Sequence, residues 1–203
     1  MNRFFLILFF IPFSLFAKFY PGSITLYDGV KKNGFLEIPH NYNDDHIRFR
    51  LEKNGKTENF EIDYVRSFEI VNDRNTAENY IPLYLGNPDS KGDIYIAKKK
   101  SWVKIIKEGK ISIYSATLPF LPDNASRGIG YYIKRQNEHH GLYLGVGKKG
   151  FNFCSDFNTL KNILKVYFEK DCPALFDLII SADLQNNGLG QIVELYEQNC
   201  GAK

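Results

Sequence analysis

Apolar and polar residues alternate along much of the first three quarters of the chain. Between residues 47 and 52 the order is Ile-Arg-Phe-Arg-Leu-Glu, so an extended backbone would bury one face and expose the other. Asn54-Gly55 follows, a residue pair that strongly favours a tight turn, and the alternation resumes at Phe60 and Ile62. The pattern predicts a β-hairpin over these residues.

Short apolar runs separated by turn residues continue to about residue 153. The polar stretch Asn72–Asn79 predicts a loop, Gly86–Asp89 predicts a turn, and the two prolines of Leu118–Ser126 predict an ordered surface loop. Many short strands with frequent turns are typical of a mostly antiparallel sandwich or a partly closed barrel. Further strands are expected at residues 23–26, 34–38, 64–71, 93–97, 102–106, 110–115, 130–134 and 141–146.

The spacing of apolar residues becomes helical near Asp156. Phe157, Leu160 and Leu164 mark one face of a first helix, and further helices are expected over residues 175–184 and 189–200. None is amphipathic over enough length to be stable alone, so the helices should pack on the sheet or on each other. The predicted fold class is therefore α+β, with a β-rich body over residues 18–153 and a small C-terminal helical segment, 154–203, packed on it.

The first seventeen residues have the three parts of a secretory signal. Met1-Asn2-Arg3 is a short basic start, residues 4–16 are almost entirely apolar, and Ala17 is a small residue before the composition changes. The apolar stretch is too short to cross a bilayer as a stable helix. We expect cleavage after Ala17 and export to the periplasm or the cell exterior, where the protein could also lie peripheral to the outer membrane.

Composition excludes several classes of partner. The 203 residues carry a formal charge of +3, of which Arg3 supplies one, and the small surplus is spread along the chain. It forms no basic patch of the kind that binds nucleic acid. No segment after residue 17 is apolar enough for a transmembrane helix. Gly128-Ile129-Gly130 lacks the spacing of a phosphate-binding loop, and no cofactor is predicted.

An ordered series of segments carries a resemblance. The series runs from Gly34-Phe35-Leu36 through residues 60–70 and 102–114 to Asp171-Cys172-Pro173 and the closing Asn199-Cys200. In this order and spacing the chain resembles a family of uncharacterised proteins exported by Bacteroidota, over most of the length after residue 17. The resemblance implies export and a β-rich body with a C-terminal helical segment, and it implies no particular activity.

Two of the three cysteines are candidates for a disulfide. Cys172 precedes the second expected helix and Cys200 ends the third, so a helical hairpin could bring them together in an oxidising compartment. The alternative is a pair of neighbouring buried thiols.

Cys154 is the remaining cysteine. Phe151, Phe153 and Phe157 around it indicate a small buried residue with an inert thiol. The alternative makes it a nucleophile served by His139 or His140 and steered by Asp156, although no catalytic-cysteine signature surrounds it.

Two short histidine-containing segments are candidate metal sites. His139 and His140 are adjacent, and neighbouring side chains of a strand point to opposite faces, so they rarely share one ion. Asp44-Asp45-His46 lacks the oxygen-ligand spacing of a calcium loop. Both are expected to be solvated loops, and no metal is predicted.

Basic and aromatic residues suggest two binding surfaces, each with a more ordinary explanation. Lys98-Lys99-Lys100 near Trp102 could contact an anionic surface, but lysines also protect an exposed edge strand from pairing with other chains. Aromatic strands could bind sugar or peptide, but cross-strand packing uses the same residues more often. The tyrosines concerned are Tyr80, Tyr84, Tyr95, Tyr114, Tyr131, Tyr132 and Tyr143.

The function expected from these observations is a non-catalytic envelope or secreted module that binds an unknown macromolecular partner. A lipid or small-ligand carrier and an unfamiliar hydrolase using Cys154 are the alternatives. The three differ in the cavity they need: a filled core for the module, a deep apolar pocket for the carrier, and a cleft joining Cys154 to a histidine for the hydrolase.

Overall fold

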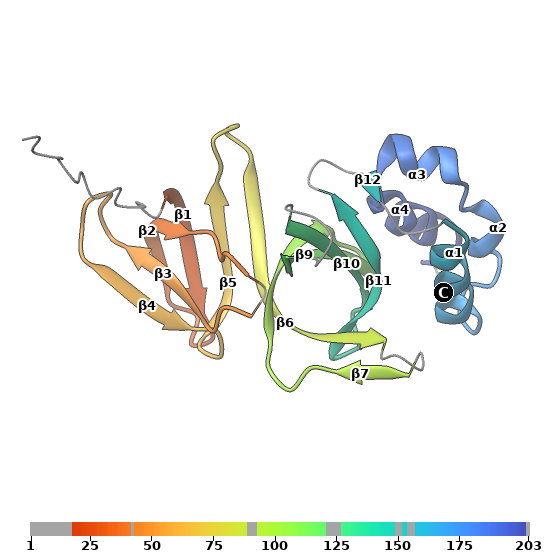
Figure 1. Cartoon of the computed structure of the whole chain (residues 1–203), viewed down its shortest axis with the longest axis horizontal. Coiled ribbons are helices and arrows are strands. Elements are labelled where there is room, and N and C mark those ends of the chain that lie inside the picture. Colours follow the sequence, from red (N-terminus) through yellow and green to blue (C-terminus); the bar gives the residue numbers. More distant parts are fainter. Residues whose placement is uncertain are drawn as a thin grey trace, which may run out of the picture.

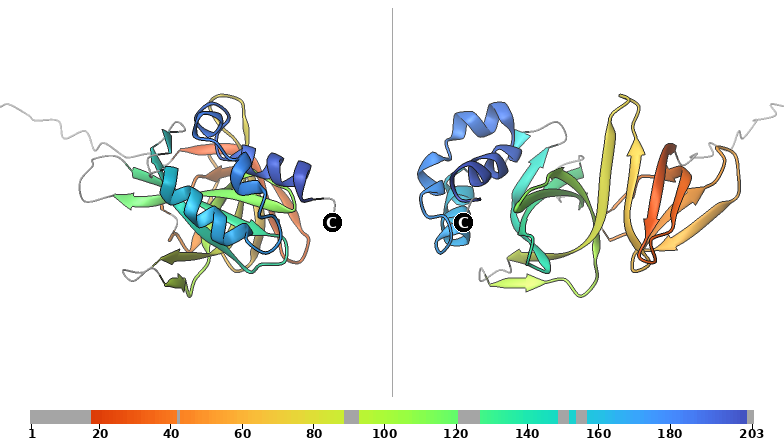
Figure 2. Two further views of the ribbon diagram at one scale, coloured as in Figure 1. Left: turned by 90° about the vertical axis from the view of Figure 1, so that its right-hand side faces the viewer. Right: turned by 180° about the vertical axis from the view of Figure 1, so that it is seen from behind.

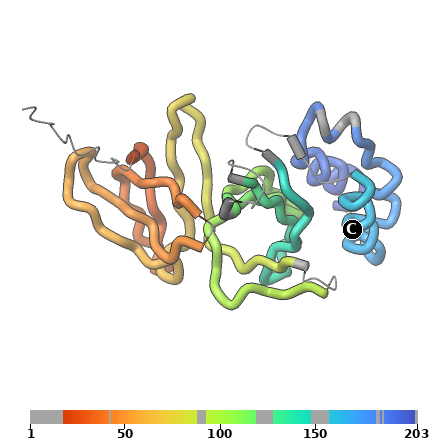
Figure 3. The backbone as a smooth tube through the Cα atoms, viewed as in Figure 1, coloured from red at the N-terminus to blue at the C-terminus, as the bar shows by residue number. Residues whose placement is uncertain are grey.

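Three parts follow one another along the long axis of the molecule: a β-lobe, a partial ring of strands and a group of helices (Figure 1). A computed structural model describes residues 18–41, 43–88, 93–120, 127–148, 152–153 and 157–201. Figure 3 traces the backbone from the lobe through the ring to the helices.

The strands are β1 (Phe19–Leu26), β2 (Lys31–Glu37), β3 (His46–Arg50), β4 (Thr57–Glu61), β5 (Val65–Val71), β6 (Ala77–Pro88), β7 (Ile94–Ile96), β8 (Ser101–Lys107), β9 (Ile111–Phe120), β10 (Arg127–Arg135), β11 (His140–Lys148) and β12 (Asn152–Phe153). The helices are α1 (Phe157–Phe168), α2 (Leu175–Leu178), α3 (Ser181–Asn187) and α4 (Gly190–Asn199).

The α+β prediction is confirmed, because a mostly antiparallel sheet precedes a few C-terminal helices. The predicted hairpin is β3 and β4, in which Ile47 pairs with Phe60. In the lobe, β1 lies between β2 and β5, and all three are antiparallel. The alternating residues of these strands bury one face, which forms a core around Phe49, Phe68 and Trp102.

Strand β6 joins the lobe to the ring, and here two sequence expectations are wrong. Its first half pairs with β5 and β8, and its second half pairs with β11 in parallel and with β7. Residues 77–79 of the expected loop and 86–88 of the expected turn therefore belong to one strand. The reason at Gly86 is close packing, since a Cβ there would lie 3.0 Å from the His140 ring and 3.1 Å from Ile94.

The ring is formed by β6, β8, β9, β10 and β11, and the β11–β6 pairing joins its ends (Figure 2). Its interior is filled by side chains that are at most 5% exposed, the largest of them from Tyr114 and Tyr132. The other buried members of this cluster are Leu83, Leu85, Val103 and Ala116. The inside of the ring is thus a packed core.

Tyr132→Phe is expected to lower the free energy of unfolding by about 1 kcal/mol, because it removes a hydroxyl that donates to a partner inside the fold. Tyr132 is 1% exposed, and its hydroxyl donates to Asn87 Oδ1 at 3.1 Å. Tyr143→Phe is the matched control, since this hydroxyl makes no hydrogen bond to the described residues, and the expected change is below about 0.5 kcal/mol. Urea denaturation measures both variants. Equal losses of stability would contradict the assigned role of the hydroxyl.

The helices pack on the outer face of β9, β10 and β11. Leu160, Leu164 and Phe168 of α1 are buried there against Ile133 and Leu144. Helix α4 is fastened to the end of β8 by an ion pair of 2.8 Å between Lys107 Nζ and Glu194 Oε1. None of the helices in the described ranges has the length and apolarity needed to cross a lipid bilayer.

The helix expected over residues 175–184 is two helices, α2 and α3. The chain is extended at Ile179 and Ile180, with ψ angles of 111° and 147°. Ile179 is 1% exposed and belongs to the core beneath the helices. Two successive β-branched residues favour the extended backbone at this point.

The pairing predicted for Cys172 and Cys200 is present as a disulfide. Their Cα atoms lie 5.8 Å apart, and 28 positions separate them in the sequence. The bond connects the segment between α1 and α2 to the residue that follows α4. It therefore closes a loop that contains α2, α3 and α4.

Candidate functional site

A large open cleft lies between the ring and the helices, with a volume of about 1170 Å³. Strands β7 and β11 contribute one wall, α1 contributes the other, and the turns after β8 and β10 and helix α4 close one end. Apolar lining comes from Ile94, Leu142, Tyr143, Ile163, Val166, Tyr167 and Tyr196. Polar and charged lining comes from Lys110, Arg135, Gln136, Asn137, Asn162, Lys170 and Asp171.

The period of helix α1 explains how one helix serves both the core and the cleft. One face of the helix packs into the core through Leu160, Leu164 and Phe168. The neighbouring face, with Ile163 and Val166, lines the cleft. Val166 is 75% exposed, which is unusual for an aliphatic residue in a helix packed on a sheet. The cleft therefore has an uncovered apolar wall.

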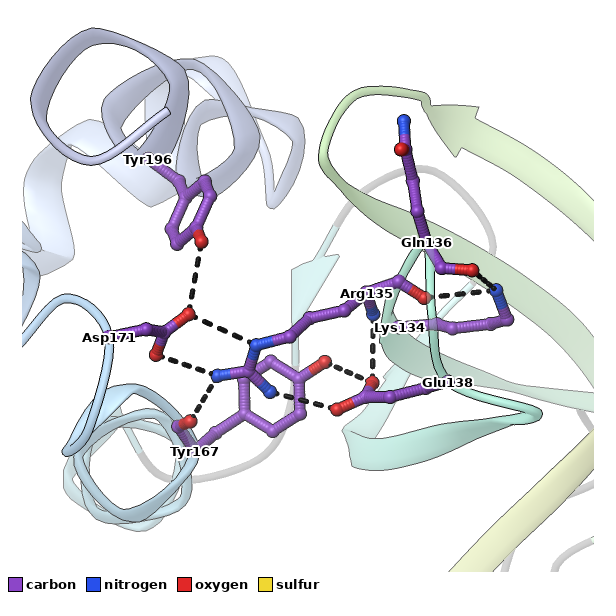
Figure 4. Close-up of polar contacts among 7 residues, drawn as sticks. All are labelled: Lys134, Arg135, Gln136, Glu138, Tyr167, Asp171 and Tyr196. Atoms are coloured by element: carbon purple, nitrogen blue, oxygen red, sulfur yellow. Dashed lines mark hydrogen bonds and ion pairs between the residues drawn. The ribbon is translucent and has the colours of Figure 1, made fainter. Parts of the chain in front are cut away.

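Arg135, the last residue of β10, holds this end of the cleft together (Figure 4). Its guanidinium donates to both carboxylate oxygens of Asp171, with Nη2 at 2.8 Å and Nε at 3.1 Å. It also donates to Glu138 Oε1 at 2.8 Å and to the Tyr167 carbonyl oxygen. The guanidinium carbon lies 3.8 Å from the centre of the Tyr167 ring. One cation thus connects the β10–β11 turn, α1 and the segment that leads to the disulfide.

Both carboxylates of this cluster have further donors. The Tyr196 hydroxyl donates to Asp171 at 3.0 Å, and the Tyr167 hydroxyl donates to Glu138. Burial favours a higher pKa for each carboxyl, but the hydrogen bonds outweigh it, and the pKa values of Asp171 and Glu138 lie below their ordinary values. Burial and Glu138 together raise the pKa of Tyr167. The carboxylates stay ionised and the tyrosine stays protonated at neutral pH.

The Arg135 cluster is a network of ion pairs and hydrogen bonds. Each charged group in it is bound to an opposite charge or to a fixed hydroxyl, so none is poised to exchange a proton near neutral pH. The arrangement is suited to hold a cleft of fixed shape.

Comparison with known proteins assigns no relative. No protein-family model, no curated protein and no solved structure matches this chain. The geometry of the molecule itself therefore carries the functional argument.

The residues proposed for a hydrolase are only partly within the described structure. Cys154 and Asp156 lie outside the described residues. His139 is exposed after the β10–β11 turn, and His140 begins β11, where it pairs with Tyr84 of β6. Neither histidine lines the cleft.

The second histidine segment has local contacts. Asp44 accepts the backbone N–H groups of His40 and Asn41, and Asp45 lies 2.7 Å from His46 Nδ1. Within the described ranges, no group of three or more His, Cys, Asp or Glu side chains is arranged to hold a metal ion.

A small pocket of about 100 Å³ lies beside this segment, around the carboxylate of Glu37. That side chain is 5% exposed and faces the Arg48 guanidinium, with Nη1 at 3.0 Å, and the His40 ring, with Nε2 at 2.8 Å. Neither carboxylate oxygen has an aligned hydrogen-bond donor among the described residues. The pocket is too small for more than a few water-sized groups.

The lysines expected to protect an edge strand lie elsewhere. Lys98, Lys99 and Lys100 are in the connection between β7 and β8, and β8 is an interior strand between β6 and β9. The Lys100 ammonium lies 3.0 Å from Asp63 and 5.3 Å from the centre of the Tyr27 ring. It helps to join the ring to the lobe.

Most of the tyrosines considered for ligand binding are packing residues. Tyr114, Tyr131 and Tyr132 are at most 5% exposed, and Tyr80 stacks on Phe68 with ring centres 4.7 Å apart. Tyr84 and Tyr95 are 36% and 55% exposed. Only Tyr143 of the expected set lines the cleft.

The residues that shape the cleft were missed by sequence reasoning. Arg135 ends β10 and Glu138 follows in a polar turn, and Tyr167 has the same spacing as core residues of α1. Asp171 stands out in the sequence only as part of the turn before Cys172. No local pattern marks these residues, since the contacts join positions about thirty residues apart.

Proposed function

We propose that this protein is an exported, non-catalytic binding module that holds part of another macromolecule in the cleft. The observation that carries the proposal is the uncovered apolar wall, where Val166 is 75% and Ile94 is 48% exposed. This wall lies beside the Arg135 cluster, in which the charges are paired. Exposed apolar surface within a concave site is the usual mark of an interaction site. The disulfide and the predicted secretory signal support export, because such bonds persist in oxidising compartments.

The alternatives have less support. A carrier using the ring interior would need space that Tyr114 and Tyr132 occupy. A hydrolase based on Cys154 remains a prediction, since that residue lies outside the described ranges.

Photo-crosslinking in the cells that naturally make the protein tests the proposal. A benzoylphenylalanine in place of Val166 is expected to give one discrete adduct with a macromolecule, because the cleft wall is then in contact with the partner. The control carries the same residue in place of Leu51, an aliphatic side chain that is 69% exposed in the lobe. Mass spectrometry identifies the adducts. No adduct from position 166, or the same adducts from both positions, would refute the proposal.

A further inference from the structure

We infer that the occupant of the cleft is an extended peptide segment that carries aliphatic side chains and at least one carboxylate. This inference rests on the proposed function and names the chemistry of the partner at that site. Four properties of the cleft support it: its length, its unused amides, its unpaired cations and its aliphatic wall.

The length and openness of the cleft suit a polymer chain. Its α1 wall runs from Asn162 to Tyr167, about 8 Å at the rise of an α-helix, and Lys170 extends it beyond the end of α1. About two to three residues of an extended peptide cover the helical part. Because the cleft is more open than enclosed, such a segment can enter and leave it while remaining part of a longer chain.

Carboxamide side chains on α1 and at the closed end of the cleft match a peptide backbone. Asn162 on α1 and Asn137 in the β10–β11 turn line the cleft, and both are exposed. Neither side-chain amide is hydrogen-bonded to another described residue. Each amide offers a donor and an acceptor, as each peptide group does. An extended segment that runs along α1 to this turn could satisfy both.

The cations of the cleft favour an acidic segment. Lys110 and Lys170 line it and form no ion pair within the described ranges. The carboxylate that also lines it, Asp171, is bound on both oxygens by Arg135. A ligand therefore meets two uncompensated positive charges and no unpaired negative one on the lining. Ile94, Ile163 and Val166 of the same lining supply apolar surface for aliphatic side chains.

Two other occupants fit less well. A sugar usually stacks on an open aromatic face, but the Arg135 guanidinium covers a face of Tyr167 at 3.8 Å, and the Tyr196 hydroxyl is bound to Asp171. An acyl chain is best held in an enclosed apolar cavity, and the enclosed interior of the ring is already filled.

Selection from a phage-displayed library of random nine-residue peptides tests the inference, with the oxidised protein as target. Peptides selected on the wild type are expected to be enriched in Asp and Glu over Lys and Arg. On Lys110→Glu/Lys170→Glu this preference should invert, and on the matched control Lys56→Glu, an exposed lysine of the lobe, it should persist. A synthetic copy of the most enriched peptide should bind about tenfold more weakly to the neutral variant Lys110→Gln/Lys170→Gln. Melting temperatures confirm that each variant is folded.

The outcomes separate the inference from the proposed function. Peptides that lose binding to Val166→Glu but show no acidic preference would overturn the inference and leave the cleft as a binding site. The same holds if no peptide is selected while a glycan array or lipid vesicles bind in a manner sensitive to Val166→Glu. Acidic peptides that bind Val166→Glu as well as the wild type would refute both, because binding would then lie outside the cleft.

Discussion

Breaking the disulfide by Cys200→Ser is expected to lower the free energy of unfolding by about 3.5 kcal/mol. The bond closes a loop of 28 positions, and the stabilisation expected from restricting the unfolded chain grows with the logarithm of that length. The loss should concentrate in the helices, since the bond ties the connection between α1 and α2 to the residue that follows α4. Hydrogen exchange measured by mass spectrometry should therefore accelerate in α1 to α4 and remain nearly unchanged in β1 to β5.

Thiol counting provides the control for this prediction. In denaturant without reductant, the wild type should show one reactive thiol, from Cys154, and Cys200→Ser should show two. Cys154→Ser should show none. The reduced wild type should match Cys200→Ser in stability. A Cys200→Ser variant as stable as the oxidised wild type would mean that the bond does not support the helical group.

Replacing Arg135 with methionine is expected to lower the free energy of unfolding by about 3 kcal/mol at neutral pH. Methionine keeps an unbranched side chain of similar length but leaves the carboxylates of Glu138 and Asp171 without their cation. Loss of one partner of a buried ion pair costs about 3 to 5 kcal/mol, and the partial exposure of this cluster places it at the lower limit. Arg66→Met, at an exposed position of β5, should change stability by less than about 0.5 kcal/mol.

The pH dependence distinguishes this electrostatic role from packing. The pKa values of Asp171 and Glu138 are lower in the folded protein than in the unfolded chain. Their contribution to stability is therefore complete when the pH lies above the pKa values of the unfolded chain, near pH 4 to 5. It is lost as the pH falls through the lower pKa values of the folded protein. The difference between wild type and Arg135→Met should shrink as the pH is lowered from about 6 to about 2. A difference that stays constant in urea titrations over this range would show that lost packing dominates.

Local patterns of the sequence predicted the local structure of this protein well. The β3–β4 hairpin depends on Asn54-Gly55 and a two-residue alternation, and both are readable over a few positions. The buried face of α1 follows from helical spacing, and the disulfide follows from a helical group that returns on itself. In each case the contacts that decide the structure join residues close together in the sequence, or they involve cysteine, a residue type that is easily recognised.

Features that depend on distant pairing escaped prediction. Strand β6 has four partner strands, and its Gly86 and Asn87 have the composition of a turn although they serve close strand packing. The Arg135 cluster joins the end of β10 to positions 32 and 36 residues away. Arginine, glutamate and tyrosine are common on any surface, so nothing in the sequence selects these residues as partners. The cleft, which depends on both features, could not be located without the structure.

The parallel pairing between β11 and β6 also fixes the order in which the molecule can fold. Tyr84 to Gly86 must wait for His140 to Leu142, which appear more than fifty residues later during synthesis. The antiparallel hairpins of the lobe join neighbouring segments and can form earlier. A nascent chain thus carries a nearly finished lobe while the second half of β6 still lacks its β11 neighbour, and during that interval the exposed strand is the part of the molecule most prone to pair with another chain.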